Sequence, residues 1–431
     1  MIRRFIFILF SMILFIMPLI GVAEEDLVEL DSEHLKWLEY RCSLPDGGLV
    51  LTGGMGLSGA GKETGAYVLC LNADRTVRWE YTDREKNGYT SAEEATVLAD
   101  GTIAVVVWDY PEKIAVKFFT PRGKRARKKL DLTKQCEPWQ IYDITPSFIV
   151  QFEYLGNAAD PEDFRYETTL YDWQGKEIAR YDGLIVYGGY GFSVNGSEEL
   201  VAFGQDTFYN SHAVLMKINW EQGSVLWETV LDYRQPETDT AVLDDVTVTE
   251  DGGYAARVQE RKPAADDSYE DTNYLARFDA EGRLLWIRDM ESLYRNGRLT
   301  NLFSCGGYLV MLFESGENES WSKGEPVRFL WTDPDGNKLG TTELTLRPED
   351  FRLTRDRQYP EEEGVHRYPV LAIDRMIRME DGLWAFATLY IAEKHDGDDA
   401  ILYPSEDQEF TIIRIPEYKQ PETGKPEVME G

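Results

Sequence analysis

Clustered aspartates are the residues in this sequence whose types and spacing come nearest to a metal site. The segment HDGDD (395–399) places Asp396, Asp398 and Asp399 close together, and DPDGN (333–337) offers two carboxylates and an amide. Hard cations such as Ca²⁺ take oxygen ligands from loops of this kind, but neither segment has the spacing of an EF-hand. We expect DPDGN to form a β-turn, since Asp and Gly suit such turns. Asp396, Asp398 and Asp399 remain a candidate Ca²⁺ site.

Other patterns that carry chemistry are incomplete. The four histidines (His34, His212, His366 and His395) are scattered without metal-binding spacing. The glycine-rich segment 53–65 resembles a phosphate loop, but Glu63 stands where Ser or Thr must bind Mg²⁺. A carboxylate pair for glycoside hydrolysis cannot be picked out among 77 acidic residues. We therefore name no catalytic residue and expect no cofactor, with Ca²⁺ as the one candidate.

The cysteines are few and offer no redox motif. They are Cys42, Cys70, Cys136 and Cys305, and none stands in a CxxC pair. An even number in an exported chain could form disulfides. Cys42 and Cys70, however, fall on the first and third strands of one repeat, with another strand between them. We expect buried free thiols.

A repeat of about 50 residues organises the elements that must position any site. Each unit holds four short apolar or alternating strands, separated by turn residues such as Asp-Gly and Asn-Gly. The second turn of each unit has a glycine at nearly every occurrence, and tryptophan recurs four residues later. In order, the turn position holds Arg75, Gly123, Gly175, Gly223, Gly282 and Gly336, and the later position holds Trp79, Arg127, Ala179, Trp227, Trp286 and Gly340.

These units predict an all-β fold, a β-propeller of seven four-stranded blades. A single four-stranded sheet cannot bury both of its faces, whereas sheets packed radially can. The recurring tryptophans would then fill the gaps between neighbouring blades. The last blade, with FTIIRI (410–415) as its third strand, lacks a fourth. We expect residues 26–30 to supply it, which closes the ring and removes an exposed edge. Six or eight blades remain alternatives.

The units YLARFDAEGRLLW and VLMKINWEQGSVLW resemble the repeats of quinoprotein-like (PQQ-like) β-propellers and of related secreted bacterial propeller proteins. The resemblance covers most of the chain and is strongest in the units that end in Trp79, Trp227 and Trp286. It implies the propeller fold, which dehydrogenases and scaffold subunits share. Function has to be argued from a site.

The two ends of the chain are predicted to lie outside the propeller. Arg3 and Arg4 precede an apolar run (5–20), and Gly21-Val22-Ala23 has the small residues of a cleavage site. We therefore expect a signal peptide over 1–23, with an uncleaved anchor as the alternative. The propeller would span 24–416. Residues 417–431 are rich in Pro and charged side chains, and they are expected to form a disordered tail.

Charge narrows the range of partners. The chain has 45 basic and 77 acidic residues, with a formal net charge of −32, and loss of Arg3 and Arg4 makes the mature chain more acidic. This charge argues against binding of nucleic acid and against docking on anionic lipid. We expect an extracellular or cell-envelope protein, monomeric, without membrane insertion after signal cleavage.

The connections between strands predict where a ligand would bind. In a four-stranded blade the first and third connections lie on one face of the disc, and here they are short; we call this the short-turn face. The second connections and the links between blades lie on the other, the long-loop face. Long connections often gather on the binding face. They carry acids and aromatics, and the candidate ligand-face residues are Tyr209, Tyr269, Trp321 and Tyr359. We expect the short-turn face to hold no site.

These features favour an exported, non-catalytic binding or scaffold propeller whose partner is a protein or a carbohydrate. An enzyme, either quinone-dependent or carbohydrate-active, is the first alternative. A structural envelope protein is the second.

Overall fold

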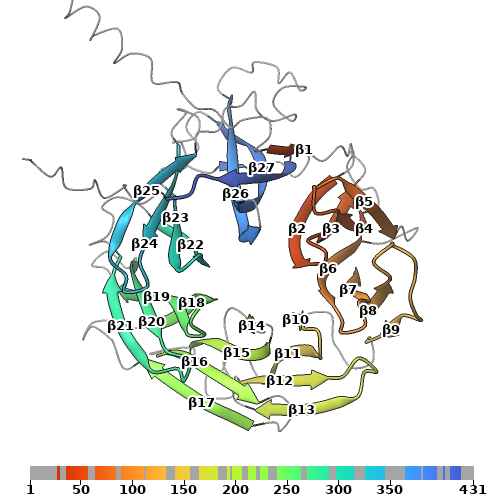
Figure 1. The fold of residues 1–431 in the computed structure, drawn as a ribbon, viewed down its shortest axis with the longest axis horizontal. Helices are drawn as coiled ribbons and strands as arrows, with labels where there is room; N and C mark the ends of the chain where they lie inside the picture. Colours follow the sequence, from red (N-terminus) through yellow and green to blue (C-terminus); the bar gives the residue numbers. More distant parts are fainter. Residues whose placement is uncertain are drawn as a thin grey trace, which may run out of the picture.

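The computed structural model shows a ring of antiparallel sheets around a central axis (Figure 1). Every regular element among the described residues is a β-strand. The described residues are 27–29, 35–56, 64–83, 89–110, 113–132, 141–155, 165–182, 192–194, 197–205, 212–219, 224–231, 240–263, 269–290, 298–314, 326–344, 365–379, 382–395, 401–402 and 408–418.

Seven blades make up the ring, which confirms the predicted fold class. Blade 1 contains β2 (Leu35–Ser43), β3 (Leu49–Gly56), β4 (Thr64–Leu71) and β5 (Val77–Asp83). Blade 2 contains β6 (Tyr89–Val97), β7 (Ile103–Tyr110), β8 (Lys113–Phe119) and β9 (Leu130–Asp131). Blade 3 contains β10 (Ile141–Ile144), β11 (Ile149–Leu155), β12 (Arg165–Tyr171) and β13 (Glu177–Asp182). Blade 4 contains β14 (Phe192–Val194), β15 (Ser197–Gln205), β16 (Ala213–Asn219) and β17 (Ser224–Leu231).

Blade 5 contains β18 (Thr240–Val248), β19 (Tyr254–Pro263), β20 (Tyr269–Phe278) and β21 (Leu284–Asp289). Blade 6 contains β22 (Arg298–Cys305), β23 (Tyr308–Glu314), β24 (Val327–Thr332) and β25 (Lys338–Leu344). Blade 7 contains β26 (Val365–Met379), β27 (Gly382–His395), β29 (Gln408–Ile415) and β1 (Leu27–Glu29), and β28 (Ile401–Leu402) pairs with β27. One parallel pair, Thr64 with Tyr89, joins the sheets of blades 1 and 2.

Ring closure follows the prediction from the sequence. Strand β1 pairs antiparallel with β29, with Leu27 opposite Ile413 and Glu29 opposite Thr411. The first strand of the chain thus becomes the outermost strand of the last blade. Since β1 is antiparallel to β29, its first residue lies toward the short-turn face. Strand β29 ends at that face, so both ends of the propeller chain lie on the same side of the ring.

Clusters of buried apolar side chains fill the gaps between neighbouring blades, except that none is described between blades 3 and 4, and the recurring tryptophans contribute to this packing. Trp227 of blade 4 contacts Gly282 in the last turn of blade 5, where an added Cβ would lie 2.4 Å from the indole. Trp79 contacts Gly123 in the same way, and Trp286 contacts Gly336. These turn glycines have φ near +75°, a conformation that L side chains rarely adopt. Tryptophan and glycine recur together because they are two sides of one contact between blades.

Where the tryptophan is missing, other groups fill the gap. The outermost strand of blade 7, β1, has no tryptophan. At the gap between blades 7 and 1, Arg75, at φ 67°, instead stacks 3.7 Å over the ring of Trp384 from β27. Blade 6 has Gly340 at the tryptophan position, and the ring of Tyr418 lies where a Cβ would stand. Glu417 also forms an ion pair with Arg378. Glu417 and Tyr418 therefore contact the propeller just past its predicted boundary.

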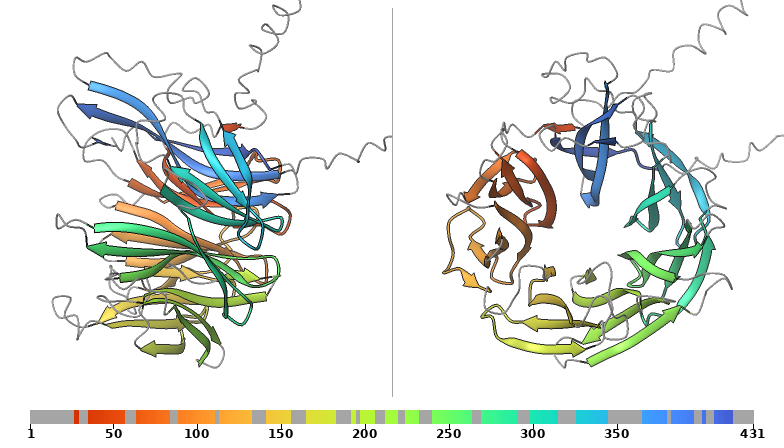
Figure 2. Two further views of the ribbon diagram at one scale, coloured as in Figure 1. Left: turned by 90° about the vertical axis from the view of Figure 1, so that its left-hand side faces the viewer. Right: turned by 180° about the vertical axis from the view of Figure 1, so that it is seen from behind.

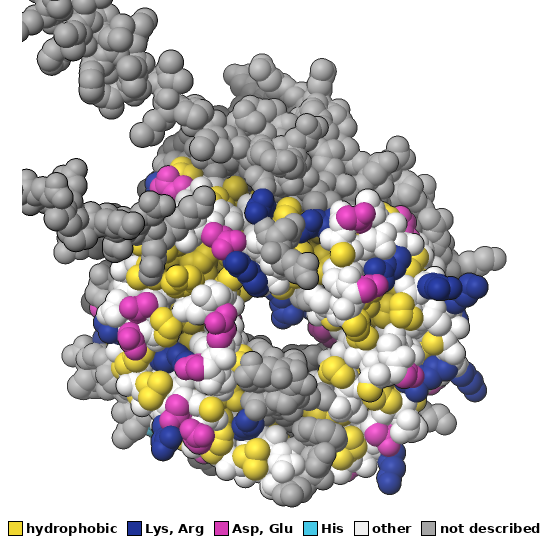
Figure 3. Space-filling view, viewed as in Figure 1, with side chains coloured by type: hydrophobic (Ala, Val, Ile, Leu, Met, Phe, Trp, Pro, Cys, Tyr) yellow, Lys and Arg dark blue, Asp and Glu magenta, His cyan; other side chains and the backbone are white. Residues whose placement is uncertain are grey.

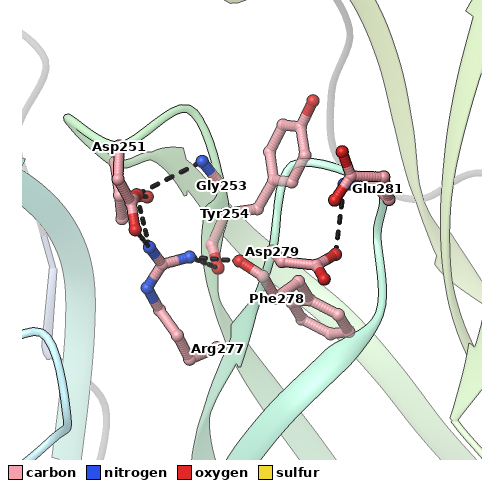
Figure 4. A network of polar contacts seen from close by, with 8 residues as sticks. Asp251, Gly253, Tyr254, Arg277, Phe278, Asp279 and Glu281 are labelled. Atoms are coloured by element: carbon pink, nitrogen blue, oxygen red, sulfur yellow. Dashed lines mark hydrogen bonds and ion pairs between the residues drawn. The ribbon is translucent and has the colours of Figure 1, made fainter.

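The first turn of blade 5 shows how an Asp-Gly-Gly sequence is held (Figure 4). Arg277, only 2% exposed, forms an ion pair with Asp251 and donates to the carbonyls of Tyr254 and Phe278. A Cβ at Gly253 would lie 2.4 Å from both Arg277 and the Phe278 carbonyl. Blade 1 repeats the arrangement with Asp46, Gly48 and Arg78. These charged groups stabilise the turns, and we therefore assign them no binding role.

The cysteines agree with the expectation of free thiols for the three that are described. Cys42, Cys70 and Cys305 form no disulfide. Cys42 and Cys70 both lie opposite Val50, with β3 between their strands. Burial raises the pKa of Cys42 to about 12 and that of Cys70 to about 11, so both remain protonated and unreactive. Cys136 lies outside the described residues.

Candidate functional site

The site residues predicted from the sequence mostly lie outside the described part of the chain. This holds for Asp396, Asp398, Asp399, Tyr209, Trp321 and Tyr359. Tyr269 begins β20 and is paired with Pro263, but its side chain is not described. Among the described residues no group of His, Cys, Asp and Glu could hold a metal ion. The Ca²⁺ site and the aromatic ligand face thus stay predictions. Segment 333–337, by contrast, is the expected turn, with the Asp333 carboxylate accepting the Asn337 N–H at 2.8 Å.

A different feature stands out among the described residues, on the outer rim of blade 2. The connection from β8 to β9 runs through PRGKRARKK (121–129), and every residue of it except Gly123 is exposed. We call residues 121–129 the basic hairpin. Its six cations are Arg122, Lys124, Arg125, Arg127, Lys128 and Lys129. Figure 3 shows Lys and Arg side chains projecting from the right-hand rim of the ring, over β8 and β9.

The basic hairpin is held firmly by its neighbours. Trp79 of blade 1 packs on Gly123, and its indole N–H donates to the Pro121 carbonyl at 3.0 Å. The turn is closed by the Gly123 N–H, which donates to the Thr120 carbonyl at 2.9 Å. Farther along, Arg125 pairs with Phe119 as an isolated bridge. The cations are therefore displayed on an ordered frame, which lowers the entropy lost when they bind a partner.

A buried lysine lies next to the basic hairpin. Lys117 of β8 is 7% exposed, contacts the Asp83 carboxylate and lies 3.3 Å from the Tyr81 hydroxyl. Arg125 donates to that same hydroxyl at 3.0 Å, so Tyr81 connects the buried cation to the exposed ones. Burial, with the positive charges of Arg125 and Lys129, lowers the pKa of Lys117 to about 8. The positive field of the hairpin thus extends into the gap between blades 1 and 2.

The cations of the basic hairpin also differ from other surface cations in forming no ion pair with a carboxylate of the described residues, although the charge of Arg127 helps to lower the pKa of the exposed Asp100 carboxyl. Arg180, Arg283 and Arg328 are each paired with a glutamate or an aspartate at 2.6 to 2.9 Å. No ion pair links the six hairpin cations to any carboxylate of the described residues. Arg127 instead stacks 3.8 Å over the ring of Phe118. In a chain with 77 acidic residues, such a group of unpaired cations is a surface that can bind an anion.

This surface was missed from the sequence because charge was judged over the whole chain. The run RGKRARKK was visible, with six basic residues and no acid. Read alone, such a run predicts an anion-binding patch. The net charge of −32 concealed it.

Comparison with known proteins finds similarity only to solved structures, and that similarity is weak. No protein-family model matches the sequence, and no curated protein matches it. Among solved structures, the β-propeller domain of the trilobed protease from Pyrococcus furiosus is similar, with 8% identity and a TM-score of 0.46 over 90% of this chain and 98% of that one. The acylaminoacyl peptidase of Pyrococcus horikoshii matches at 10% identity and a TM-score of 0.44, covering 84% of this chain and 53% of the peptidase.

The WD40 domain of SCAP from fission yeast matches at 10% identity and a TM-score of 0.38, over 90% of this chain and 96% of that domain. This chain spans about half the length of the P. horikoshii acylaminoacyl peptidase. Identities and TM-scores this low carry no activity to this chain, and the β-propeller fold is shown by the ring of sheets itself. No helix among the described residues is long and apolar enough to cross a membrane.

Proposed function

We propose that the protein is an exported, non-catalytic binding or scaffold propeller whose partner, a protein or a carbohydrate, binds on the long-loop face. The observation that carries the proposal is the difference between the two faces of the ring. On the short-turn face, tight turns at Gly47, Gly101, Gly175, Gly252 and Gly336 are closed by backbone hydrogen bonds of 2.8 to 3.0 Å. Such turns leave little surface for a ligand.

The connections on the long-loop face are longer and can provide more residues for binding. The segments between second and third strands are 57–63, 111–112, 156–164, 206–212, 264–268, 315–326 and 396–407. Blade 7 adds to this face, because β26 and β27 have 15 and 14 residues and pair along their whole length. Their far ends, Val365 with His395, lie on the long-loop side, where β28 also pairs. Binding residues are often carried on such extensions of a rigid scaffold.

The test is a pull-down from the envelope of the source cells. One variant replaces 264–268 and 315–325 with short Gly-Ser links. The polar and acidic residues of 260–273 predict a longer loop in blade 5, but β19 extends to Pro263 and β20 begins at Tyr269, so only 264–268 is replaced there. The control carries Glu281→Gln and Asp335→Asn, two exposed changes on the short-turn face. We expect the loop variant, and not the control, to lose its partners. If the control lost its partners and the loop variant retained them, the proposed position of the site on the long-loop face would be wrong.

Export and the absence of catalysis have their own tests. Secreted material should begin near Glu24; a start elsewhere would contradict cleavage after Ala23. Purified protein mixed with quinone and Ca²⁺ should show no bound-quinone absorbance. A bound quinone would favour the dehydrogenase alternative instead.

We also propose that the repeat is of the quinoprotein-like type. Trp227 and Trp286, which carry the resemblance in the sequence, are the residues that contact the turn glycines Gly282 and Gly336 of the next blade. This packing supports a true repeat with equivalent positions. An alignment of blades from further sequences that failed to keep these two positions together would count against it.

A further inference from the structure

We propose that the rim of blade 2 on the short-turn face is a docking surface for an anionic lipid membrane, with the basic hairpin as its centre. Six exposed cations without carboxylate partners among the described residues lie on one hairpin. The hairpin is a projecting turn, exposed at every residue except Gly123. A projecting group of cations fits an extended anionic surface better than a small anion, which would need to be surrounded.

Exposed aliphatic side chains lie at the start of the outermost strands of the two blades next to blade 2. Val77 begins β5 of blade 1 and is 49% exposed, and Ile178 near the start of β13 of blade 3 is 36% exposed. A β-bulge separates Val77 from Trp79: Val77 is paired with Leu71, which packs toward blade 7, whereas Trp79 is paired with Cys70, which packs toward blade 2. Val77 therefore lies on the side of β5 that faces blade 7. Ile178 lies on the opposite side from Ala179, the tryptophan position of blade 3, and so faces blade 2. Aliphatic side chains beside cations are what an interfacial membrane contact requires.

The aliphatic rim continues around the ring at equivalent positions. The residues at the start of the outermost strands of blades 4 and 5 are Val225, Leu226, Leu284 and Leu285, exposed by 39 to 56%. All of them follow a turn of the short-turn face. This rim therefore presents apolar side chains on several blades, whereas blade 2 presents cations at the same place.

The path of the chain supports the same orientation. Strand β1 begins at the short-turn face, so the residues before Leu27 join the propeller there. Those residues include the apolar run 5–20. If that run stays in a membrane, even during export, the short-turn face is the one turned toward the lipid. Blade 1 alone separates β1 from blade 2 in the ring (Figure 2).

This docking departs from two expectations drawn from the sequence, that net charge argues against anionic lipid and that the short-turn face holds no site. Net charge does not prevent it. At physiological ionic strength charges are screened beyond about 8 Å, so the basic hairpin acts on lipid phosphates largely by itself. The acidic segments 361–363 and 395–399 belong to connections of the long-loop face, at the other end of the strands. Asp residues in the short turns limit the contact to the rim, which predicts an edge-on rather than a flat orientation.

The experiment is vesicle flotation with the chain from Glu24 on, which keeps every described residue and removes the apolar run. Vesicles of phosphatidylcholine alone are compared with vesicles that also contain phosphatidylglycerol. We expect binding only to the anionic vesicles, and loss of binding at high salt. Each cation removed should weaken binding about fivefold, the usual effect of one Lys or Arg near an anionic membrane.

Two triple variants make the test specific. The hairpin variant, Lys124→Glu with Lys128→Glu and Lys129→Glu, spares Arg125 and Arg127, which contact Tyr81 and Phe118. The control variant makes the same change of charge at Lys176, Arg283 and Lys338, exposed cations near the short turns of blades 3, 5 and 6. The hairpin variant should lose vesicle binding with the melting temperature of the parent. The control should keep most of the binding, and it should melt slightly below the parent because Arg283 is ion-paired with Asp279.

Several results would overturn the proposal. These are absence of binding to anionic vesicles, equal binding to neutral ones, and equal loss in both triple variants. Binding of single-stranded DNA but not of vesicles would assign the hairpin to a soluble polyanion. The partner on the long-loop face is tested by loop replacement in the pull-down, so either proposal can fail without the other.

Discussion

At the scale of single residues, the contact between a tryptophan and a turn glycine can be tested most directly. Gly336 and Gly101 both have positive φ, 74° and 80°, but only Gly336 has a neighbour, the Trp286 indole at 2.6 Å from a built Cβ. Gly101→Ala should therefore cost about 1 kcal/mol, the cost of a left-handed conformation. Gly336→Ala should cost about 2–4 kcal/mol, because the methyl group also clashes with the ring.

A double-mutant cycle separates the cost of the backbone conformation from the cost of the clash with the Trp286 ring. Trp286→Ala should itself cost about 3 kcal/mol, at the low end for a large aromatic because Trp286 is only partly buried. In that background Gly336→Ala should cost no more than Gly101→Ala does, since the methyl group has space. Urea denaturation of the four proteins gives the values. Additive costs would mean that Trp286 and Gly336 do not share a contact.

Lys117 gives a prediction about pH. Its pKa falls from 10.5 to about 8 on folding, so between these values the unfolded chain binds more protons. Stability from this group should rise with pH across that window, by up to about 3 kcal/mol, and be constant below it. Lys117→Met removes the effect, so the free energy of unfolding of wild type relative to this variant should increase from pH 8 upward.

The matched control is Lys113→Met on the same strand, since Lys113 is 58% exposed. The difference in free energy of unfolding between wild type and Lys113→Met should change much less with pH. Denaturation at several pH values measures both differences. A Lys117→Met difference that stays flat, or that runs in the opposite direction, would show that the ion pair with Asp83 outweighs burial.

Residue types were predicted from the sequence where local geometry fixes them. The turn glycines and the tryptophans follow from φ angles and from the need to fill gaps between blades. The substitutes could not be foreseen, because Arg75 over Trp384 and Tyr418 over Gly340 join residues about 80 to 300 positions apart. The basic hairpin could have been predicted, since its signal is local. Only the use of net charge concealed it.

At the scale of elements, the segment after β29 completes the gap between blades 6 and 7. Tyr418 packs against the core cluster that includes Trp331 and Ile415, beside Gly340. A chain that ends after Ile415 should be less stable than one that ends after Tyr418, by about 2 kcal/mol for the lost apolar contact. The ion pair of Glu417 is partly exposed and should add little.

Gly340→Trp, the residue that the repeat has at this position, provides a rescue. It should recover part of the loss in the chain that ends at Ile415, and it should destabilise the chain that retains Tyr418. Melting temperatures of the four proteins give the comparison. If both truncated chains melt together, Tyr418 has no structural role.

Alternating apolar residues and turn residues predicted where the strands lie. Some strands are longer than predicted and extend into segments that were predicted to be loops. In blade 5, residues 260–263 and 269–273 belong to β19 and β20. Charged residues such as Glu260 and Arg261 suggested a loop, but the hairpin register continues through them, with Arg261 opposite Asp271. The continued backbone ladder thus extends two strands that composition alone would not predict.

At the scale of the whole molecule, the fold depends on closure of the ring by two distant segments. The pairing of β1 with β29 covers only three residues, Leu27–Glu29, yet it supplies the outer strand of blade 7. Without it, β29 is an exposed edge, and exposed edges promote opening and aggregation. Deleting 24–29 should therefore lower the melting temperature by several degrees and increase aggregation. This loss of stability is expected although the deletion removes no residue from the other six blades.

The control removes 419–431, more residues from the other end, and should leave the melting curve unchanged. A synthetic peptide of residues 24–33, added to the shortened protein, should restore stability in a concentration-dependent way, because binding to the folded state stabilises it by mass action. A peptide with Val28→Pro should fail, since proline cannot donate to the ladder and disrupts pairing within a strand. If the deletion leaves the melting curve unaltered, or if both peptides act alike, closure through β1 contributes nothing and the packing between blades holds the ring alone.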